Sequence, residues 1–220
     1  MNEKVLKKIE NGREYRDMVL TVSDSEESEM IVEGYATTYD DPYLLYKFDD
    51  NTTVMEQVSR DAFVGTDMSD VIFQYNHEGR VFARISNGTL ELTSDEHGLK
   101  TVANLGGTNE GRNLYQEIKG GYTNKMSFGF TVEEDDIDVM EESNDKVVYL
   151  RTIRKIGKLY DVSAVSIPQN NFTEISARSH CDGLITEIET ERLNKQKELE
   201  QRKIAKEKLA LKIKLMKGGK

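Results

Sequence analysis

The chain has 220 residues, of which 37% are hydrophobic, 32% are charged and two are proline. This length fits one domain of ordinary size with an appendage, and the composition excludes a collagen-like or wholly disordered chain. Cys181 is the single cysteine and no apolar run approaches the ~20 residues of a membrane helix, so we expect a soluble protein without disulfides. The first residues lack the apolar core of a secretory signal, which favours a cytoplasm.

Charge is distributed unevenly along the chain. Residues 183–220 carry eleven Lys or Arg and six Asp or Glu, whereas residues 1–182 carry 19 and 34. The chain is therefore an acidic body with a basic tail. The tail is either a solvated extension or a docking segment for an acidic partner, and the acidic body argues against direct nucleic-acid binding.

Short runs rich in Val, Ile, Thr, Tyr and Phe, separated by Asp, Asn and Gly, fill residues 17–168. This pattern predicts a mainly β domain over residues 17–182, with a barrel-like antiparallel core and a few packed helices, after a flexible segment 1–16. The candidate strands are 17–23, 30–38, 53–58, 71–76, 80–86, 89–93, 99–105, 124–133, 146–155 and 158–167.

Two pairs of these strands are candidate hairpins. The turn-forming segment TSDEHG joins strands 89–93 and 99–105, and an acidic segment joins 124–133 to 146–155. The acidic segment, Glu133 to Asp145, holds eight carboxylates in thirteen residues. Mutual repulsion favours a mobile surface loop there over the alternative, a metal site.

The sequence predicts three helices. Residues 109–119 can begin at Thr108 or Asn109 and end at Gly120–Gly121, and a shorter helix can occupy 59–68. Beyond Gly183 the chain is rich in Glu, Lys, Gln and Leu, which predicts a long charged helix over 183–220. Its apolar residues are irregularly spaced, so a partner-induced assembly segment fits better than an autonomous coiled coil.

His77 is the first candidate for a catalytic side chain. It follows the apolar run VIFQY, so it lies where a strand ends. An imidazole can accept a proton near neutral pH, which few other side chains do. The alternative is an ordinary hydrogen-bonded histidine.

Ser127 lies in the segment KMSFGF, where strand alternation would bury Met126, Phe128 and Phe130 on one face. Ser127 would then share the other face with Gly129, which has no side chain. Such a gap would let an extended substrate approach the hydroxyl, although a solvent-facing serine is the alternative. A serine needs a neighbouring base to become a good nucleophile.

Asp161 lies in the segment KLYDVSAVSIP, a candidate strand whose two faces are both rather apolar after the aspartate. A carboxylate in such a place needs a hydrogen-bonding partner. A histidine ring N–H would serve, and it would leave the other ring nitrogen free as a base. The competing interpretation is a salt bridge to Arg151 or Arg154.

Five short segments together give a resemblance to a known family. They are EGYA (33–36), YNHEG (75–79), Gly98–Leu99, KMSFGF (125–130) after a helix, and LYDVSAVSIP (159–168). In this order and spacing they resemble the prohead maturation proteases of tailed bacteriophages, relatives of the herpesvirus assemblins, over residues 30–175. Ala83 stands where the family commonly has glycine.

The resemblance implies a serine endopeptidase that processes scaffold and major capsid precursors, and itself, inside an assembling procapsid in the host cytoplasm. It places the family's histidine at His77, its nucleophile at Ser127 and its acidic member at Asp161. A second histidine replaces the acid in herpesvirus enzymes, so His97 and His180 are alternatives.

The oxyanion hole is not located by the resemblance. Candidates are the backbone amides of Phe128 and Gly129, or the side chains of Arg151 and Arg154. No phosphate-binding loop, zinc-spaced Cys/His cluster or dinucleotide fingerprint is present in the sequence, so we expect neither a cofactor nor a metal.

The expected partners are the capsid precursor and scaffold as substrates and the procapsid shell, and a homo-oligomer is compatible with the sequence. We expect no membrane partner. The rival interpretation from another class is a non-catalytic capsid assembly or scaffolding protein, in which these residues are only structural. A weaker third possibility is an enzyme that uses the acidic loop as a metal site.

Overall fold

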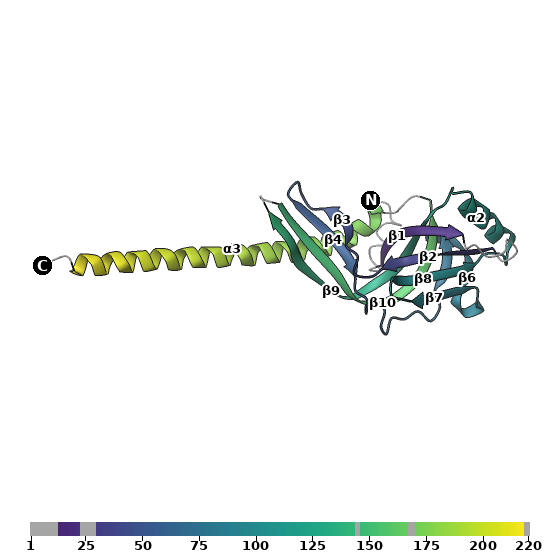
Figure 1. The fold of residues 1–220 in the computed structure, drawn as a ribbon, viewed down its shortest axis with the longest axis horizontal. Coiled ribbons are helices and arrows are strands. Elements are labelled where there is room, and N and C mark those ends of the chain that lie inside the picture. The colour runs from purple at the N-terminus through teal and green to yellow at the C-terminus, as the bar shows by residue number, and fades with distance from the viewer. Residues whose placement is uncertain (1–12, 23–29, 144–145, 167–169, 218–220) are drawn as a thin grey trace. The chain divides into compact units, whose positions relative to one another are not determined.

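The structure is a computed structural model that describes residues 13–22, 30–143, 146–166 and 170–217 (Figure 1). By its internal contacts the chain divides into two units, residues 1–179 and 180–220, which are described separately. The first unit holds all the described strands and helix α2 (Asn109–Lys119). The second consists of the greater part of helix α3 (Asn170–Lys217).

The strands of the first unit form one mixed sheet. They are β1 (Arg13–Val22), β2 (Ile31–Thr38), β3 (Tyr43–Lys47), β4 (Thr52–Val58), β5 (Ile72–Tyr75), β6 (Glu78–Arg84), β7 (Leu90–Ser94), β8 (Gly98–Asn104), β9 (Lys125–Ser143) and β10 (Lys146–Val165). Their order in the sheet is β3-β4-β10-β9-β1-β2-β8-β7, and the β5–β6 hairpin branches off at β10. The mainly β prediction is confirmed, although the strands do not close into a barrel.

The sheet is not wholly antiparallel, which corrects the sequence-based prediction. β4 pairs in parallel with the first half of β10, and β5 pairs in parallel with its last residues. One long strand provides both pairings because the predicted break at residues 156–157 is absent. Gly157 lies instead among shifts of register within β10, as glycine does at strand irregularities.

The acidic segment beginning at Glu133 belongs to β9, so the prediction of a loop is wrong up to residue 143; residues 144–145 lie outside the described residues. Three of its carboxylates form ion pairs with basic residues across the β9–β10 ladder, which offsets part of the repulsion. The ion pairs are Lys155–Glu133 at 3.1 Å, Arg154–Asp136 at 2.7 Å and Arg151–Asp135 at 2.6 Å. Among the described residues, no cluster of three or more His, Cys, Asp or Glu could hold a metal ion.

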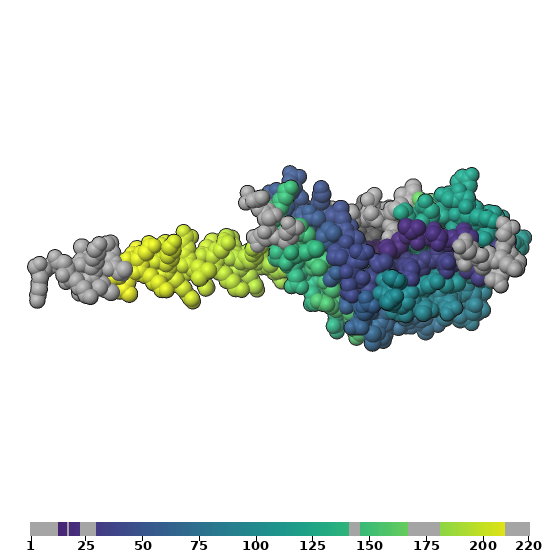
Figure 2. Space-filling view, viewed as in Figure 1, coloured from purple at the N-terminus to yellow at the C-terminus, as the bar shows by residue number. Residues whose placement is uncertain are grey.

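The N-terminal prediction needs a similar correction. Residues 1–12 lie outside the described residues, but residues 13–16 are part of β1 rather than a flexible segment. They are held because Arg13 to Val19 pair antiparallel with β9. β1 is visible at the surface as the purple band in Figure 2. Its residue Val19 is exposed.

The predicted helix at 109–119 is confirmed as α2. The Thr108 hydroxyl accepts a hydrogen bond from the Gly111 amide at 3.0 Å, and Leu114, Tyr115 and Ile118 are buried. The prediction of a second helix at residues 59–68 is wrong.

Residues 59–66 form successive tight turns in place of that helix. The amides of Ala62 and Val64 donate to the carbonyls of Ser59 and Asp61. The segment cannot form a regular helix because other backbone groups in it are used by β10. The Ser59 amide donates to the Ile153 carbonyl, and the Ala62 carbonyl accepts from the Ile156 amide.

The long helix predicted beyond Gly183 is α3, which begins earlier in the chain, at Asn170. Leu193, Leu199, Ile204 and Leu209 are exposed along it. Across the part of the chain that the structure describes, no helix combines the length and the apolar content needed to cross a membrane.

The core of the first unit fixes which side chains of β9 point inward. Met126, Phe128 and Phe130 are fully buried in it, and the two phenylalanine rings stack with centroids 4.6 Å apart. Residues between them, Ser127 and Gly129, must therefore lie on the opposite face of the sheet. This face is the one that carries the candidate site.

Candidate active site

The sheet register brings together side chains from three neighbouring strands. On β9, Ser127 lies opposite Ser163 of β10, and Gly129 lies between Asp161 of β10 and Tyr15 of β1. Directly opposite residues of a pair share one face, with Cβ atoms about 4.5–5.5 Å apart. We call this face of the sheet the serine face; its residues are Tyr15, Ser127, Gly129, Asp161 and Ser163.

His77 reaches the serine face from the turn between β5 and β6. Asn76 and His77 both have positive φ angles, +51° and +57°, which a two-residue hairpin turn of this kind requires. Asn76 ties the turn to the end of β10, because its amide donates to the Ala164 carbonyl at 2.9 Å and its side-chain oxygen accepts from the Ser166 amide at 3.2 Å. These bonds hold a backbone geometry that is unfavourable for residues other than glycine.

His77 is hydrogen-bonded to Asp161. Its Nδ1 lies 2.5 Å from Asp161 Oδ1, and the imidazole is almost completely buried. An ionised carboxylate only accepts hydrogen bonds, so Nδ1 carries the proton and Nε2 is left as the basic nitrogen. The competing salt bridge of Asp161 to Arg151 or Arg154 is absent, since both arginines pair with other carboxylates.

Two buried polar atoms on or beside the serine face have no hydrogen-bonding partner among the described residues. They are His77 Nε2 and Ser127 Oγ, and Ser127 has 0% of its surface exposed. Buried polar atoms without partners are uncommon and unfavourable, and a catalytic role is one explanation for them. An unpaired basic nitrogen and an unpaired hydroxyl are the two groups that nucleophilic catalysis by serine requires.

Tyr15 covers this region and was not identified from the sequence. Its ring lies against His77 with centroids 4.3 Å apart in an edge-to-face arrangement. A Cβ atom added to Gly129 would lie 2.7 Å from a Tyr15 ring carbon and 2.5 Å from Asp161 Oδ2. The gap at Gly129 therefore admits the carboxylate and the tyrosine ring, which corrects the expectation that an extended substrate fills it.

Burial raises the pKa of the Tyr15 hydroxyl, and the negative charge of Asp161 raises it further. Tyr15 therefore stays neutral near physiological pH. Its ring is an uncharged cover over the imidazole.

The structure does not bring Arg151 to the serine face. Its guanidinium donates to Glu14 and Glu56, at 2.7 Å and 2.8 Å, and also pairs with Asp135. Glu14 precedes Tyr15 in β1, so it points to the opposite face of that strand. The Arg151 cluster, defined as Glu14, Arg16, Glu56, Asp135 and Arg151, is thus separated from Ser127 by the sheet.

Arg16 completes this cluster with hydrogen bonds to Glu14 and Glu56. Burial by itself would raise the pKa of the Glu14 carboxyl, but the positive charges and hydrogen bonds of Arg16 and Arg151 outweigh it and lower that pKa to about 2. Glu14 is therefore ionised at neutral pH. The charges of this cluster serve the fold and not the candidate site.

The other oxyanion candidates are placed as follows. Arg154 is half exposed and pairs with Asp136. Phe128 and Gly129 lie in register with both β1 and β10, so their amides point within the sheet toward neighbouring backbone. None of these four residues presents a free donor toward the Ser127 hydroxyl.

A family model described as caudovirus prohead serine protease matches residues 18–184. The chain belongs to this family. Searches of curated proteins and of solved structures gave no match. The family is one of serine peptidases that act in bacteriophage capsid maturation, which agrees with the function expected from the sequence.

Of the other two histidines of this prohead protease, the structure describes the side chain of His97 alone. His97 lies in the β7–β8 turn, where its side chain is largely exposed and lies 3.8 Å from Glu96. The side chain of His180 lies outside the described residues. Asp161 is therefore the described partner of His77.

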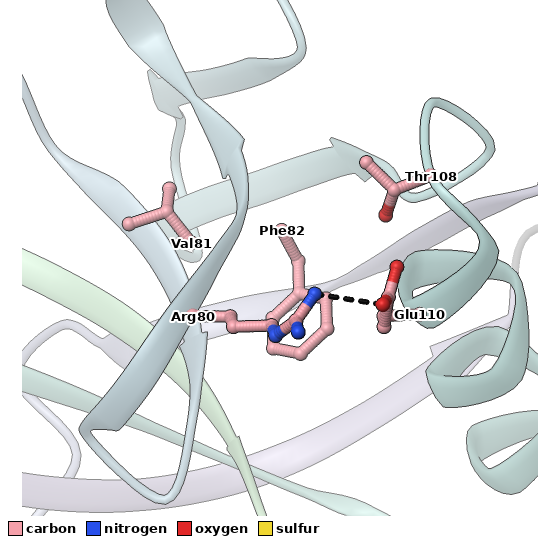
Figure 3. Close-up of a pocket in the computed structure, with 5 residues that line it drawn as sticks. All are labelled: Arg80, Val81, Phe82, Thr108 and Glu110. Atoms are coloured by element: carbon pink, nitrogen blue, oxygen red, sulfur yellow. Dashed lines mark ion pairs between the residues drawn. The ribbon is translucent and has the colours of Figure 1, made fainter.

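A cavity of about 240 Å³ lies between β6 and the start of α2 (Figure 3). Arg80 and Glu110 form an ion pair of 2.7 Å beside the Phe82 ring, and Val81 and Thr108 complete the lining. His77, Ser127 and Asp161 do not line this cavity. It is a separate feature of the prohead protease surface.

Sequence reasoning also missed Ser163. Its hydroxyl donates to Asp161 Oδ1 at 2.8 Å, and its side chain is fully buried. The sequence could have indicated Ser163 by its position, because residues two apart in a strand lie on the same face and Ser163 follows Asp161 by two. Tyr15 could not be found in this way because its segment was predicted to be flexible.

Proposed function

We propose that His77, Ser127 and Asp161 form the catalytic triad of this prohead protease. In this proposal Nε2 of His77 removes the proton of Ser127 as Oγ attacks a peptide carbonyl. Asp161 holds the imidazole and stabilises its charge after proton transfer. An acyl-enzyme forms as the amine departs, and water then hydrolyses it.

One observation carries the proposal. The His77–Asp161 hydrogen bond fixes one ring nitrogen, while the other nitrogen and the Ser127 hydroxyl are both buried and unpaired on the same sheet face. Thr101 Oγ1 is also buried and unpaired, so what favours a reactive role here is that the unpaired nitrogen belongs to an imidazole already held by a carboxylate. Unpaired polar atoms beside an oriented base are what a nucleophile awaiting substrate requires.

Ser127 has no exposed surface, so the proposal includes a movement that opens the site. Tyr15 lies against His77, and we propose that it is the side chain that moves. Displacement of this ring would bring a substrate carbonyl to Oγ. The oxyanion donors would have to be supplied in that opened state, because the four candidates named from the sequence do not point to Ser127.

The proposed substrates are the major capsid precursor and the scaffold, and the enzyme is also proposed to cleave itself. The proposed place of action is the interior of the procapsid in the host cytoplasm, where confinement would raise enzyme and substrate concentrations together. The basic tail over residues 183–220 would engage scaffold or shell. Self-association and the relation to herpesvirus assemblins remain predictions.

The test uses the full chain and its Ser127→Ala variant, each coexpressed with capsid precursor and scaffold. We expect processed fragments with the wild type and none with the variant. Mass spectrometry of the purified chain would also locate self-cleavage. Ser86→Ala removes an exposed hydroxyl in the short helix η1 (Ile85–Asn87) and serves as the matched control.

A second measurement reports on the hydroxyl directly. A fluorophosphonate probe should label Ser127 of the wild type and of Ser86→Ala but not of Ser127→Ala. Identical processing by wild type and Ser127→Ala would overturn the peptidase assignment of this serine. The non-catalytic assembly protein would then be the better interpretation.

A further inference from the structure

Asp161 has two hydrogen-bond donors on the same oxygen. His77 Nδ1 lies 2.5 Å from Oδ1, and the Ser163 hydroxyl lies 2.8 Å from the same atom. The second oxygen, Oδ2, lies over Gly129, close enough that a Cβ atom there would overlap it. The carboxylate is therefore confined on one side by backbone and fixed on the other by Ser163.

Ser163 is poorly explained by packing alone. It has 0% of its surface exposed, between Val162 and Ala164, and the strand around it is otherwise apolar. A buried hydroxyl is unfavourable unless it is hydrogen-bonded, and the bond it makes is to the carboxylate. An alanine would fill this position without that requirement.

The strand register also places Ser163 beside the proposed nucleophile. It lies directly opposite Ser127, whereas Asp161 lies opposite Gly129. A carboxylate that rotated about its χ angles could turn away from the imidazole, and the Ser163 hydroxyl opposes this rotation by holding Oδ1. Holding a group in its reactive orientation lowers the activation barrier, because less entropy is lost in orienting that group at each turnover.

We propose that Ser163 is a positioning residue that holds Asp161 in the orientation needed to support His77. This inference rests on the proposed function of the triad. Ser163 does not touch the reacting atoms, and it acts through the carboxylate. Its loss should therefore lower kcat and leave KM unchanged.

The experiment compares Ser163→Ala with Ser163→Thr in the full chain. Ser163→Ala removes the donor, and we expect the rate of fluorophosphonate labelling at Ser127, and kcat on a peptide substrate, to fall about tenfold. Ser163→Thr keeps a hydroxyl and suits a strand, so it should recover the rate to within about threefold of wild type. Thr101→Val is the control, because it removes a buried hydroxyl in β8 that makes no hydrogen bond.

A spectroscopic measurement separates positioning from a general structural effect. The proton on His77 Nδ1 should exchange with water faster in Ser163→Ala than in wild type, because the carboxylate that holds it moves more freely. Thr101→Val should leave this exchange unchanged. Circular dichroism confirms that each variant is folded, and rates are compared per folded molecule.

The outcomes distinguish this inference from the proposed function. If wild type is not labelled at Ser127, the triad itself is wrong. If wild type is labelled and folded Ser163→Ala reacts at the same rate, only the role of Ser163 is overturned. Failure of a folded Ser163→Thr variant to recover the rate also overturns it.

Discussion

Two buried polar networks lie on opposite faces of the strand β1. On one face Glu14 and Arg16 belong to the Arg151 cluster, and on the other Tyr15 covers His77. In the Arg151 cluster each carboxylate meets a guanidinium. On the serine face, by contrast, His77 Nε2 and Ser127 Oγ are left unpaired.

Whether buried polar atoms have partners therefore separates structural from reactive polar residues. A buried charge network that satisfies its members specifies the fold, and removing one member leaves the others unpaired. A site that leaves a base and a hydroxyl unpaired gives up stability and keeps those atoms free for a substrate. The two faces should therefore respond to substitution in opposite ways.

The largest expected effect separates activity from stability. Ser127→Ala should reduce peptidase activity by at least about 10³-fold, because the proposed nucleophile is lost. Its free energy of unfolding should stay equal to that of the wild type or rise slightly, since the hydroxyl makes no hydrogen bond that the variant would lose. Activity assays and urea unfolding measure the two quantities, and a marked loss of stability would show that Ser127 serves the fold.

The opposite response is expected from the Arg151 cluster. Arg151→Met should lower the free energy of unfolding by about 3–5 kcal/mol, because Glu14, Glu56 and Asp135 would be left without this cation. Arg154→Met removes an exposed arginine paired with Asp136, and it should cost less than about 1 kcal/mol. Similar losses in the two variants would contradict the distinction.

Acid should weaken the same cluster. The pKa of Glu14 is about 2 in the folded protein and near ~4.3 when unfolded, so the unfolded chain binds more protons between these values. Its contribution to stability, on the order of 2–3 kcal/mol, is present above about pH 5 and is lost as the pH falls toward 2. In urea unfolding across this range, Glu14→Gln should show a shallower dependence on pH than wild type; an equal slope would refute the assignment.

The smallest effect concerns the fit of the carboxylate on the serine face. Gly129→Ala would place a methyl group against Asp161 Oδ2 and the Tyr15 ring, which are side-chain atoms that can shift. We expect labelling of Ser127 to slow by about 10-fold, with a loss of stability near 1 kcal/mol. Gly157→Ala is the matched control in β10, where the nearest atom would be at an ordinary 3.5 Å. Equal rates in the two variants would count against this account.

The elements with strong local patterns could be predicted from the sequence. Helix α2 follows from its cap at Thr108 and its exit glycines, and the alternation in KMSFGF correctly separates Phe128 from Ser127. Local patterns could not predict pairing between distant segments. The carboxylates from Glu133 onward are compatible with a strand only because β10 supplies Arg151, Arg154 and Lys155 across the ladder.

The candidate site was predictable in part for the same reason. His77 stood out because an imidazole can accept a proton near neutral pH, and Asp161 because a carboxylate in an apolar strand needs a partner. The structure brings the two together. Tyr15 was missed because its role depends on the pairing of β1 with β9, which nothing in its own sequence indicates. β3 was missed as well, since YLLYK is short and follows Pro42.

The dual pairing of β10 has a consequence for the order of events during synthesis. β4 and β5 are made early, yet both pair with β10, which lies about a hundred residues later in the chain. Contacts so distant in sequence form slowly, and they cannot form on the ribosome until that late strand has emerged. The aspartate that orients His77 arrives on this same strand. An incomplete nascent chain would therefore lack the assembled site, so proteolysis would begin only after translation has passed β10.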